Sequence, residues 1–217
     1  MSPRIALIHA LTHSPPPINA ALARDWPAAV RMNLLDDSLS ADLARTGTLD
    51  ERMTQRFLTL ADYAVGTGAD AILFTCSAFG PCIDAVKTRH PGIPVLKPNE
   101  AMVDEAVALA AGTPIGLLAT FGPTLQTMPP EFPPTAVLRT ALADGAMAAL
   151  DAGDTATHDR LAVEAALRLA DQGCRVIALA QFSLARTRDA VAAATGLPVL
   201  TTPDSAVARL KALLAGG

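Results

Sequence analysis

One stretch decides the fold: Ala69-Asp70-Ala71-Ile72-Leu73-Phe74-Thr75-Cys76-Ser77-Ala78-Phe79-Gly80-Pro81. It begins with an apolar run typical of a buried strand, which ends at a cysteine between two hydroxyl residues. A Gly-Pro turn and a helical segment that starts near Cys82 follow. Strand tips that lead into helices are where open α/β folds bind ligands, because unpaired backbone N–H groups there favour an anion. Cys76 is therefore a candidate reactive thiol.

Strand-like and helix-like segments alternate along the rest of the chain. We expect strands over 5–9, 30–34, 92–96, 114–119, 136–139 and 174–180, and helices over 18–24, 49–66, 82–89, 100–111, 157–172, 184–195 and 205–214. The polar segment 36–46 is read as a surface loop or short helix. This alternation predicts parallel sheets covered by helices on both faces.

The chain carries an internal duplication. Gly92-Ile93-Pro94-Val95-Leu96 recurs 104 positions later as Gly196-Leu197-Pro198-Val199-Leu200. A repeated pattern of this kind indicates a repeated structural unit. We therefore expect an α/β fold of two similar lobes, residues 1–112 and 113–217, each a short parallel sheet flanked by helices. They would be related by a pseudo-twofold axis with a cleft between them, and the last helix could pack across to the first lobe.

The duplication also predicts where a partner for Cys76 would lie. The same shift moves Cys76 to Ala180, and one residue more moves it to Gln181, at the end of an apolar strand. In the expected arrangement positions 76 and 181 would face one cleft. Position 181 holds no thiol.

The composition excludes several classes of partner. The chain has 217 residues, 51% of them hydrophobic, so it can bury a sizeable core. Its formal net charge is -4 and it has no basic stripe, so no nucleic-acid partner is expected. It has no uninterrupted apolar run of about 20 residues, so no membrane partner is expected either.

Cysteine usage and the N-terminal segment indicate a cytoplasmic protein. Three cysteines without regular spacing favour neither a disulfide framework nor a metal site. The first apolar run, 5–11, is short and is followed by His13 and three prolines, so no signal peptide is expected. We therefore expect reduced thiols and a cytoplasmic localisation.

Four segments resemble the Asp/Glu/hydantoin racemase superfamily. They are Phe74-Thr75-Cys76-Ser77-Ala78-Phe79-Gly80, Pro94-Val95-Leu96-Lys97-Pro98-Asn99-Glu100-Ala101, Ile115-Gly116-Leu117-Leu118-Ala119-Thr120, and 176–185, where the family usually carries a Gly-Cys motif. The resemblance implies an isomerase that uses no metal or organic cofactor and acts on a small carboxylic acid, amino acid or hydantoin. Two-cysteine members use one thiol on each lobe, one to remove the α-proton and one to return a proton to the opposite face.

The match to the family's catalytic pair is incomplete. Cys76 matches the first thiol, whereas the second falls on Gln181 within Ala180-Gln181-Phe182-Ser183, which contains no cysteine. Glutamine can bind an oxygen but is no useful proton donor or base. Some relatives use a single cysteine: arylmalonate decarboxylases protonate an enediolate with one thiol, on the lobe opposite to that of Cys76, and in maleate isomerases a first-lobe cysteine attacks the alkene.

Other residues near the two strand tips are candidates for binding a substrate carboxylate. The candidates are Ser77, Ala78, Thr120, Phe121, Gln181, Phe182, Ser183 and His9, with Thr75 as a weaker choice. The hydroxyl residues could instead only cap helices. His9 or His13 could replace the missing acid or base, because an imidazole titrates near neutral pH, or either could be a solvated loop histidine.

Several further residues are interpreted as structural. Cys82 and Cys174 are expected to pack in the core, His90 and His158 to lie on the surface, and Asn99 and Glu100 to begin a helix. Arg186 and Arg188 could pair with an acid or form a solvated helix face.

The sequence leaves three functions open. The first is a racemase or isomerase that transfers a proton through Cys76. The second is a one-cysteine decarboxylase of the arylmalonate type, and the third is a non-catalytic protein that binds a small ligand; a solute receptor of the periplasmic type is a weaker form of the third. A small-molecule carboxylate is the expected partner in each case, and an exposed apolar helix face could support a homodimer.

Overall fold

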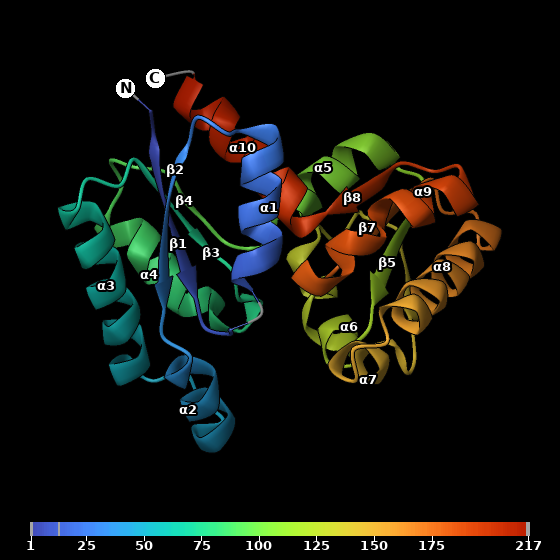
Figure 1. The fold of residues 1–217 in the computed structure, drawn as a ribbon, viewed down its shortest axis with the longest axis horizontal. Coiled ribbons are helices and arrows are strands. Elements are labelled where there is room, and N and C mark those ends of the chain that lie inside the picture. The colour runs from blue at the N-terminus through green and yellow to red at the C-terminus, as the bar shows by residue number, and fades with distance from the viewer. Residues whose placement is uncertain (1, 13, 216–217) are drawn as a thin grey trace. The chain divides into compact units, whose positions relative to one another are not determined.

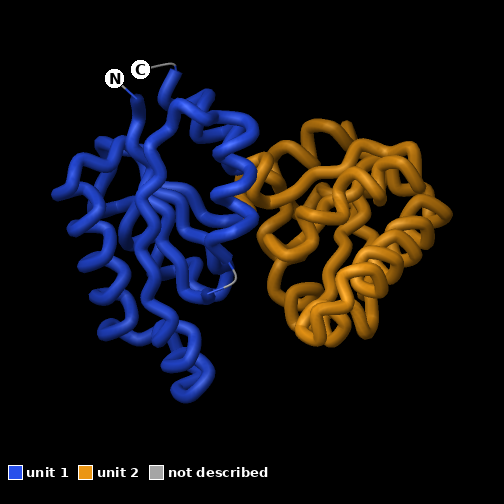
Figure 2. The backbone as a smooth tube through the Cα atoms, viewed as in Figure 1, with its two compact units in different colours: residues 1–98, 206–217 blue, residues 99–205 orange. Residues whose placement is uncertain are grey.

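The computed structural model describes residues 2–12 and 14–215. Its chain forms two compact units, residues 1–98 together with 206–217, and residues 99–205 (Figure 2). Each unit contains one four-stranded parallel sheet flanked by helices (Figure 1). The α/β fold of two similar parallel-sheet units, predicted from the alternating segments and the repeat, is confirmed.

The sheet of the first unit has the strand order β2-β1-β3-β4. Its strands are β1 (Arg4–His9), β2 (Val30–Leu35), β3 (Ala71–Phe74) and β4 (Val95–Leu96). The two central strands, β1 and β3, are almost wholly buried, as expected where helices cover both faces of a parallel sheet. In their register Ile8 pairs with Phe74, so the ends of β1 and β3 lie side by side.

Helices cover both faces of this sheet (Figure 1). They are α1 (Pro15–Asp25), α2 (Ser38–Thr46), α3 (Glu51–Gly66), the 3-10 helix η1 (Ser77–Phe79), α4 (Gly80–Arg89) and the later part of α10 (Thr202–Ala215). α3 and α4 pack on one face, where Phe57 stacks on Phe74 with 5.3 Å between ring centroids. α1 and α10 lie on the other face (Figure 1), and Lys211 Nζ donates to the carbonyl of Asp25 at the end of α1.

The sheet of the second unit has the equivalent order β6-β5-β7-β8. Its strands are β5 (Ile115–Ala119), β6 (Leu138–Leu142), β7 (Val176–Leu179) and β8 (Val199–Thr201), and its helices are α5 (Glu100–Ala110), α6 (Thr124–Thr127), η2 (Pro129–Glu131), α7 (Ala146–Asp151), α8 (Thr155–Asp171), η3 (Phe182–Thr187) and α9 (Arg188–Thr195). Side chains alternate along β5: Leu117 packs towards α5, and Leu118 packs towards α8 and α9.

The units divide at residue 98, not at residue 112 as the sequence suggested. The physical reason is the packing of α5. Its apolar face, Met102, Val103, Ala106 and Ala110, forms one core with strands β5 and β7 of the second unit. The helix that follows the last strand of the first sheet therefore belongs to the second unit, and most of α10 belongs to the first.

Three local expectations were wrong. α1 begins at Pro15 rather than at residue 18, because proline is well tolerated in the first helical turn, where its missing N–H has no intrahelical partner. The short helix α7 was not expected. His158, expected on the surface, is fully buried in α8.

The part of the chain that the structure describes contains no helix long and apolar enough to cross a bilayer.

Candidate active site

Cys76 lies two residues beyond the last residue of β3 and directly before η1. Its side chain packs in the same core as the aromatic cluster of Phe57 in α3, Phe74 in β3 and Phe79 in η1, and it is half-buried. The other two cysteines are buried, Cys82 in α4 and Cys174 before β7, as predicted for packing residues. Cys76 is thus the one cysteine of the three with partial exposure.

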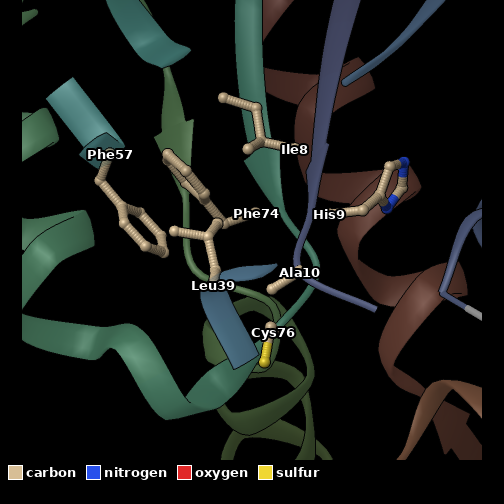
Figure 3. A pocket seen from close by; sticks show the side chains of 7 residues that line it. All are labelled: Ile8, His9, Ala10, Leu39, Phe57, Phe74 and Cys76. Atoms are coloured by element: carbon tan, nitrogen blue, oxygen red, sulfur yellow. The ribbon is translucent and has the colours of Figure 1, made fainter. Parts of the chain in front are cut away.

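A narrow pocket lies beside the Cys76 thiol (Figure 3). The lining residues are Ile8, His9, Ala10, Leu39, Phe57, Phe74 and Cys76, and the space is too narrow for a water molecule. Burial in these surroundings raises the pKa of the Cys76 thiol, since the thiolate loses its hydration. Hydrogen bonds from the backbone N–H of Ala78 and the hydroxyl of Ser40 act in the opposite direction.

The residues that follow Cys76 are open to solvent. Ser77 and Ala78 are exposed in η1, whereas Phe79 is buried against Phe57, with 4.9 Å between their ring centroids. Phe79 therefore anchors this turn in the core. Ser77 and Ala78 are left on the surface next to the thiol, where they can be reached by a ligand.

His9 is fully buried, and both of its ring nitrogens are engaged. Nδ1 lies 2.8 Å from Oγ1 of Thr75, and Nε2 lies 2.9 Å from Oδ1 of Asn33. The imidazole points away from Cys76 in Figure 3. This agrees with strand alternation, which places Ile8 and Phe74 on the face of Cys76 and His9 and Thr75 on the other. The described geometry brings His9 to Thr75 and not to the thiol.

A chain of hydrogen bonds sets the tautomer of His9. The carbonyl of Pro15 accepts from Nδ2 of Asn19, so the amide orientation of Asn19 is determined. Asn19 Nδ2 also donates to Oδ1 of Asn33, which must then be the oxygen that faces His9. The proton of neutral His9 is consequently on Nε2, and Nδ1 accepts from the Thr75 hydroxyl. Burial lowers the pKa of His9, which favours this neutral form.

In the second unit, the tips of β5 and β7 are joined by Thr120 and Gln181. Oε1 of Gln181 accepts from the backbone N–H of Thr120 at 2.6 Å and from its hydroxyl at 2.9 Å. Thr120 is buried, and Gln181 is half-buried. Two candidates named from the sequence are therefore in direct contact, although they are 61 residues apart.

Within its own unit, Gln181 holds the position that Cys76 holds in the other. Phe74 pairs with Ile8 and Leu179 pairs with Leu118, and each tip residue comes two positions later. Both have extended backbones and precede a 3-10 helix. By the same register, the equivalent of Thr120 in the first unit is Ala10. The two strand tips thus share a backbone geometry and differ in chemistry.

The remaining candidates are distributed around the second tip. Phe121 is 52% exposed, and Phe182 and Ser183 are half-buried at the start of η3. Arg186 is paired with Asp159, and Arg188 with Asp189 and Asp204.

Asn99 holds the N-cap position of α5, but its side chain lies near Glu131 and Thr202 instead of capping the helix. His13 lies outside the described residues.

A buried polar group that the sequence did not indicate is His158. Its Nδ1 lies 2.8 Å from Oδ1 of Asp159, while its Nε2 has no hydrogen-bond partner among the described residues. Asp159 in turn binds Arg186 of η3. A histidine near the start of an amphipathic helix carries no sequence signal that distinguishes burial from exposure.

Several solved structures share this fold at low sequence identity. Allantoin racemase from Klebsiella pneumoniae is 19% identical with a TM-score of 0.74, and the match covers 99% of this chain and 88% of that one. Glutamate racemase isoform RacE1 from Bacillus anthracis is 13% identical with a TM-score of 0.71, covering 99% and 82%. Unliganded arylmalonate decarboxylase is 15% identical with a TM-score of 0.66, covering 99% and 94%. These likenesses show the fold, which racemases and a decarboxylase share.

The family follows from the sequence itself. The profile of the Asp/Glu/Hydantoin racemase family matches residues 17–210, most of the chain. The chain therefore belongs to the Asp/Glu/hydantoin racemase family, and it is an enzyme. No curated protein matches it significantly.

Proposed function

We propose that this enzyme moves a proton between the Cys76 thiol and a carbon next to a carboxylate or carbonyl group, without a metal or organic cofactor. The observation that carries the proposal is the position of Cys76, half-exposed at the tip of β3, whereas Cys82 and Cys174 are buried. The substrate is a small carboxylic acid, an amino acid or a hydantoin, and the reaction is of the racemase or isomerase type.

The proton transfer has simple chemistry. The Cys76 thiolate takes the α-proton: the C–H bond breaks, an S–H bond forms, and the electron pair left on carbon delocalises into the neighbouring C=O group. For a net change, a proton must then reach the opposite face of that carbon or another carbon of the delocalised system, either from the same thiol after the intermediate has turned or from solvent. Because negative charge develops on oxygen, nearby hydrogen-bond donors lower the barrier. We propose that Ser77, which is exposed directly after Cys76, supplies one of these donors.

A one-thiol decarboxylation is the second candidate, and two observations favour it. Burial raises the pKa of Cys76, so its resting thiol is protonated at neutral pH, which is the form that a proton donor needs. The equivalent position of the other unit holds Gln181, which is no useful proton donor. In this reaction a C–C bond breaks, CO₂ leaves, and the electron pair left on carbon takes the proton of the Cys76 S–H bond.

Isotope exchange separates these functions. The protein is incubated in D₂O with aspartate, glutamate, allantoin, substituted hydantoins and arylmalonates, and NMR follows α-deuteration and loss of a carboxylate. We expect turnover of at least one compound, lost in Cys76→Ala and retained in Cys174→Ala, the matched control for removal of a thiol. Deuteration without loss of carboxylate indicates isomerase chemistry, and loss of carboxylate indicates decarboxylation.

The same panel can overturn the proposal. Exchange that persists in Cys76→Ala would show that the thiol is not the proton carrier. No turnover by the wild-type protein, together with equal ligand affinity in Cys76→Ser, would instead identify a non-catalytic binding protein.

A further inference from the structure

The carboxamide of Gln181 is held in one orientation. Its contact with the Thr120 backbone at 2.6 Å involves an N–H group, which can only donate a hydrogen bond. The contacting atom of Gln181 must therefore be the oxygen, and a flipped amide would place two donors against each other. The Thr120 hydroxyl, 2.9 Å from the same oxygen, adds a second donor.

This orientation turns the amide nitrogen of Gln181 away from Thr120. In residues 2–12 and 14–215, Nε2 of Gln181 has no acceptor, and its side chain is half-buried. Two N–H donors are thus presented at the β7 tip without a protein partner. The groups that best satisfy such donors are oxygen atoms, and those of a carboxylate bind more strongly than neutral ones.

We propose that Gln181 is a substrate-binding residue whose Nε2–H groups donate to a carboxylate or carbonyl oxygen of the substrate, and that Thr120 is the positioning residue that aims them. The inference rests on the proposed function only in that the substrate carries such an oxygen. It assigns to position 181 the binding of an oxygen and no proton transfer.

Preorganisation explains why Thr120 matters. A free glutamine side chain loses rotamer freedom when it binds a ligand, and that loss weakens binding. With Oε1 already bonded to both Thr120 donors, most of the loss occurs on folding instead. In the first unit the equivalent of Thr120 is Ala10, which has no hydroxyl, so this device is confined to the second unit.

Such fixed N–H donors stabilise negative charge on an oxygen without reorganisation. A carboxylate at position 181 would do the opposite, because it offers only acceptors on the side of the substrate.

The test is an NMR titration of the ¹⁵N-labelled protein with malonate, a small dicarboxylate. We expect the side-chain NH₂ resonances of Gln181 to shift on saturation, while the amide resonance of Thr120 keeps its position because its hydrogen bond is retained. If malonate instead displaces Gln181, the Thr120 amide moves and the Gln181 resonances become solvent-like; that result, or no shift at either residue, would overturn the proposal.

Matched variants add an affinity readout. Gln181→Glu keeps the shape and the oxygen bonded to Thr120 but replaces the NH₂ group by a carboxylate oxygen, so we expect malonate affinity to fall at least about tenfold. Thr120→Val removes the hydroxyl and should weaken binding by about three- to tenfold. Thr120→Ser restores the hydroxyl and should restore the affinity. Equal affinities for all three variants and the wild type would contradict the inference.

The outcomes distinguish this inference from the proposed function. A Gln181 shift without any isotope exchange supports the oxygen site and contradicts proton transfer on the compounds tested. Exchange that depends on Cys76 without a Gln181 shift supports the reaction and overturns the oxygen site.

Discussion

The imidazole of His9 and the hydroxyl of Thr75 form a buried hydrogen bond, with 2.8 Å between Nδ1 and Oγ1. Thr75 immediately precedes Cys76, so this bond ties the end of β3 to the end of β1 directly behind the thiol. Because both nitrogens of His9 are occupied and the ring is fully buried, His9 holds the backbone of the strand tip in place. It is a positioning residue in this geometry.

Thr75→Val tests this bond. The substitution keeps the shape of the side chain but leaves Nδ1 of the buried imidazole without a donor, so the free energy of unfolding should fall by about 1–3 kcal/mol. Urea denaturation measures the loss. Thr75→Ser keeps a hydroxyl and should lose much less; equal losses in the two variants would show that the hydrogen bond is not the cause.

The same histidine predicts a pH dependence of stability. Burial lowers the pKa of His9 below its ordinary 6.5, although the hydrogen bond with Asn33 acts in the opposite direction. Near pH 6.5 the unfolded chain therefore takes up a proton that the folded protein does not. The contribution of neutral His9 to the free energy of unfolding is complete above pH 6.5 and decreases as the pH falls below that value. Urea denaturation between pH 8 and pH 5 (roughly the window of a shifted histidine) should show this slope, reduced in His9→Gln; equal slopes in both proteins would refute it.

Gly116 marks close contact between β5 and α8. A Cβ atom at this position would lie 2.8 Å from Cδ1 of Ile177 and 3.1 Å from Cβ of Leu169. Because the Leu169 atom is attached to the helix backbone, α8 would have to move. We expect Gly116→Ala to lower the free energy of unfolding by about 1–3 kcal/mol in urea denaturation. At Gly92 an added Cβ meets no atom within 4 Å. Gly92→Ala should therefore change the free energy of unfolding by less than about 0.5 kcal/mol.

The fold could be predicted where local patterns and final packing agree. Val176–Leu179 is a continuous apolar run and becomes a strand buried on both faces. α3 shows the apolar period of a helix in its sequence, and it is capped by Asp50, whose carboxylate accepts from the N–H of Met53. α7 escaped prediction because it is short and begins after Gly145, which has a positive φ and provides no side-chain cap. Which unit α5 joins depends on packing that no local pattern records.

The positions of the two strand tips could be predicted from the sequence, and the surroundings of their side chains could not. The repeat located residues 76 and 181 at equivalent strand tips, because such positions follow from strand order. The roles of individual side chains depend on partners distant in sequence. His9 is bound by Asn33, 24 residues away, and Gln181 by Thr120, 61 residues away. That positions 76 and 181 serve one substrate stays a prediction.

Alkylation kinetics test the state of the Cys76 thiol. Since burial raises its pKa, only a small fraction is thiolate at neutral pH, and the thiolate is the form that reacts with iodoacetamide. We therefore expect Cys76 to be alkylated more slowly than a free thiol at pH 7, with a rate that increases with pH beyond the ordinary titration range of cysteine. Ser40→Ala removes a hydrogen bond that stabilises the thiolate and should slow the reaction further.

Mass spectrometry assigns the label, and Cys82 and Cys174 serve as internal controls, because both are buried and should react only on unfolding. Alkylation of Cys76 faster than that of a free thiol at pH 7 would show an activated thiolate, which would favour a resting base over a resting proton donor.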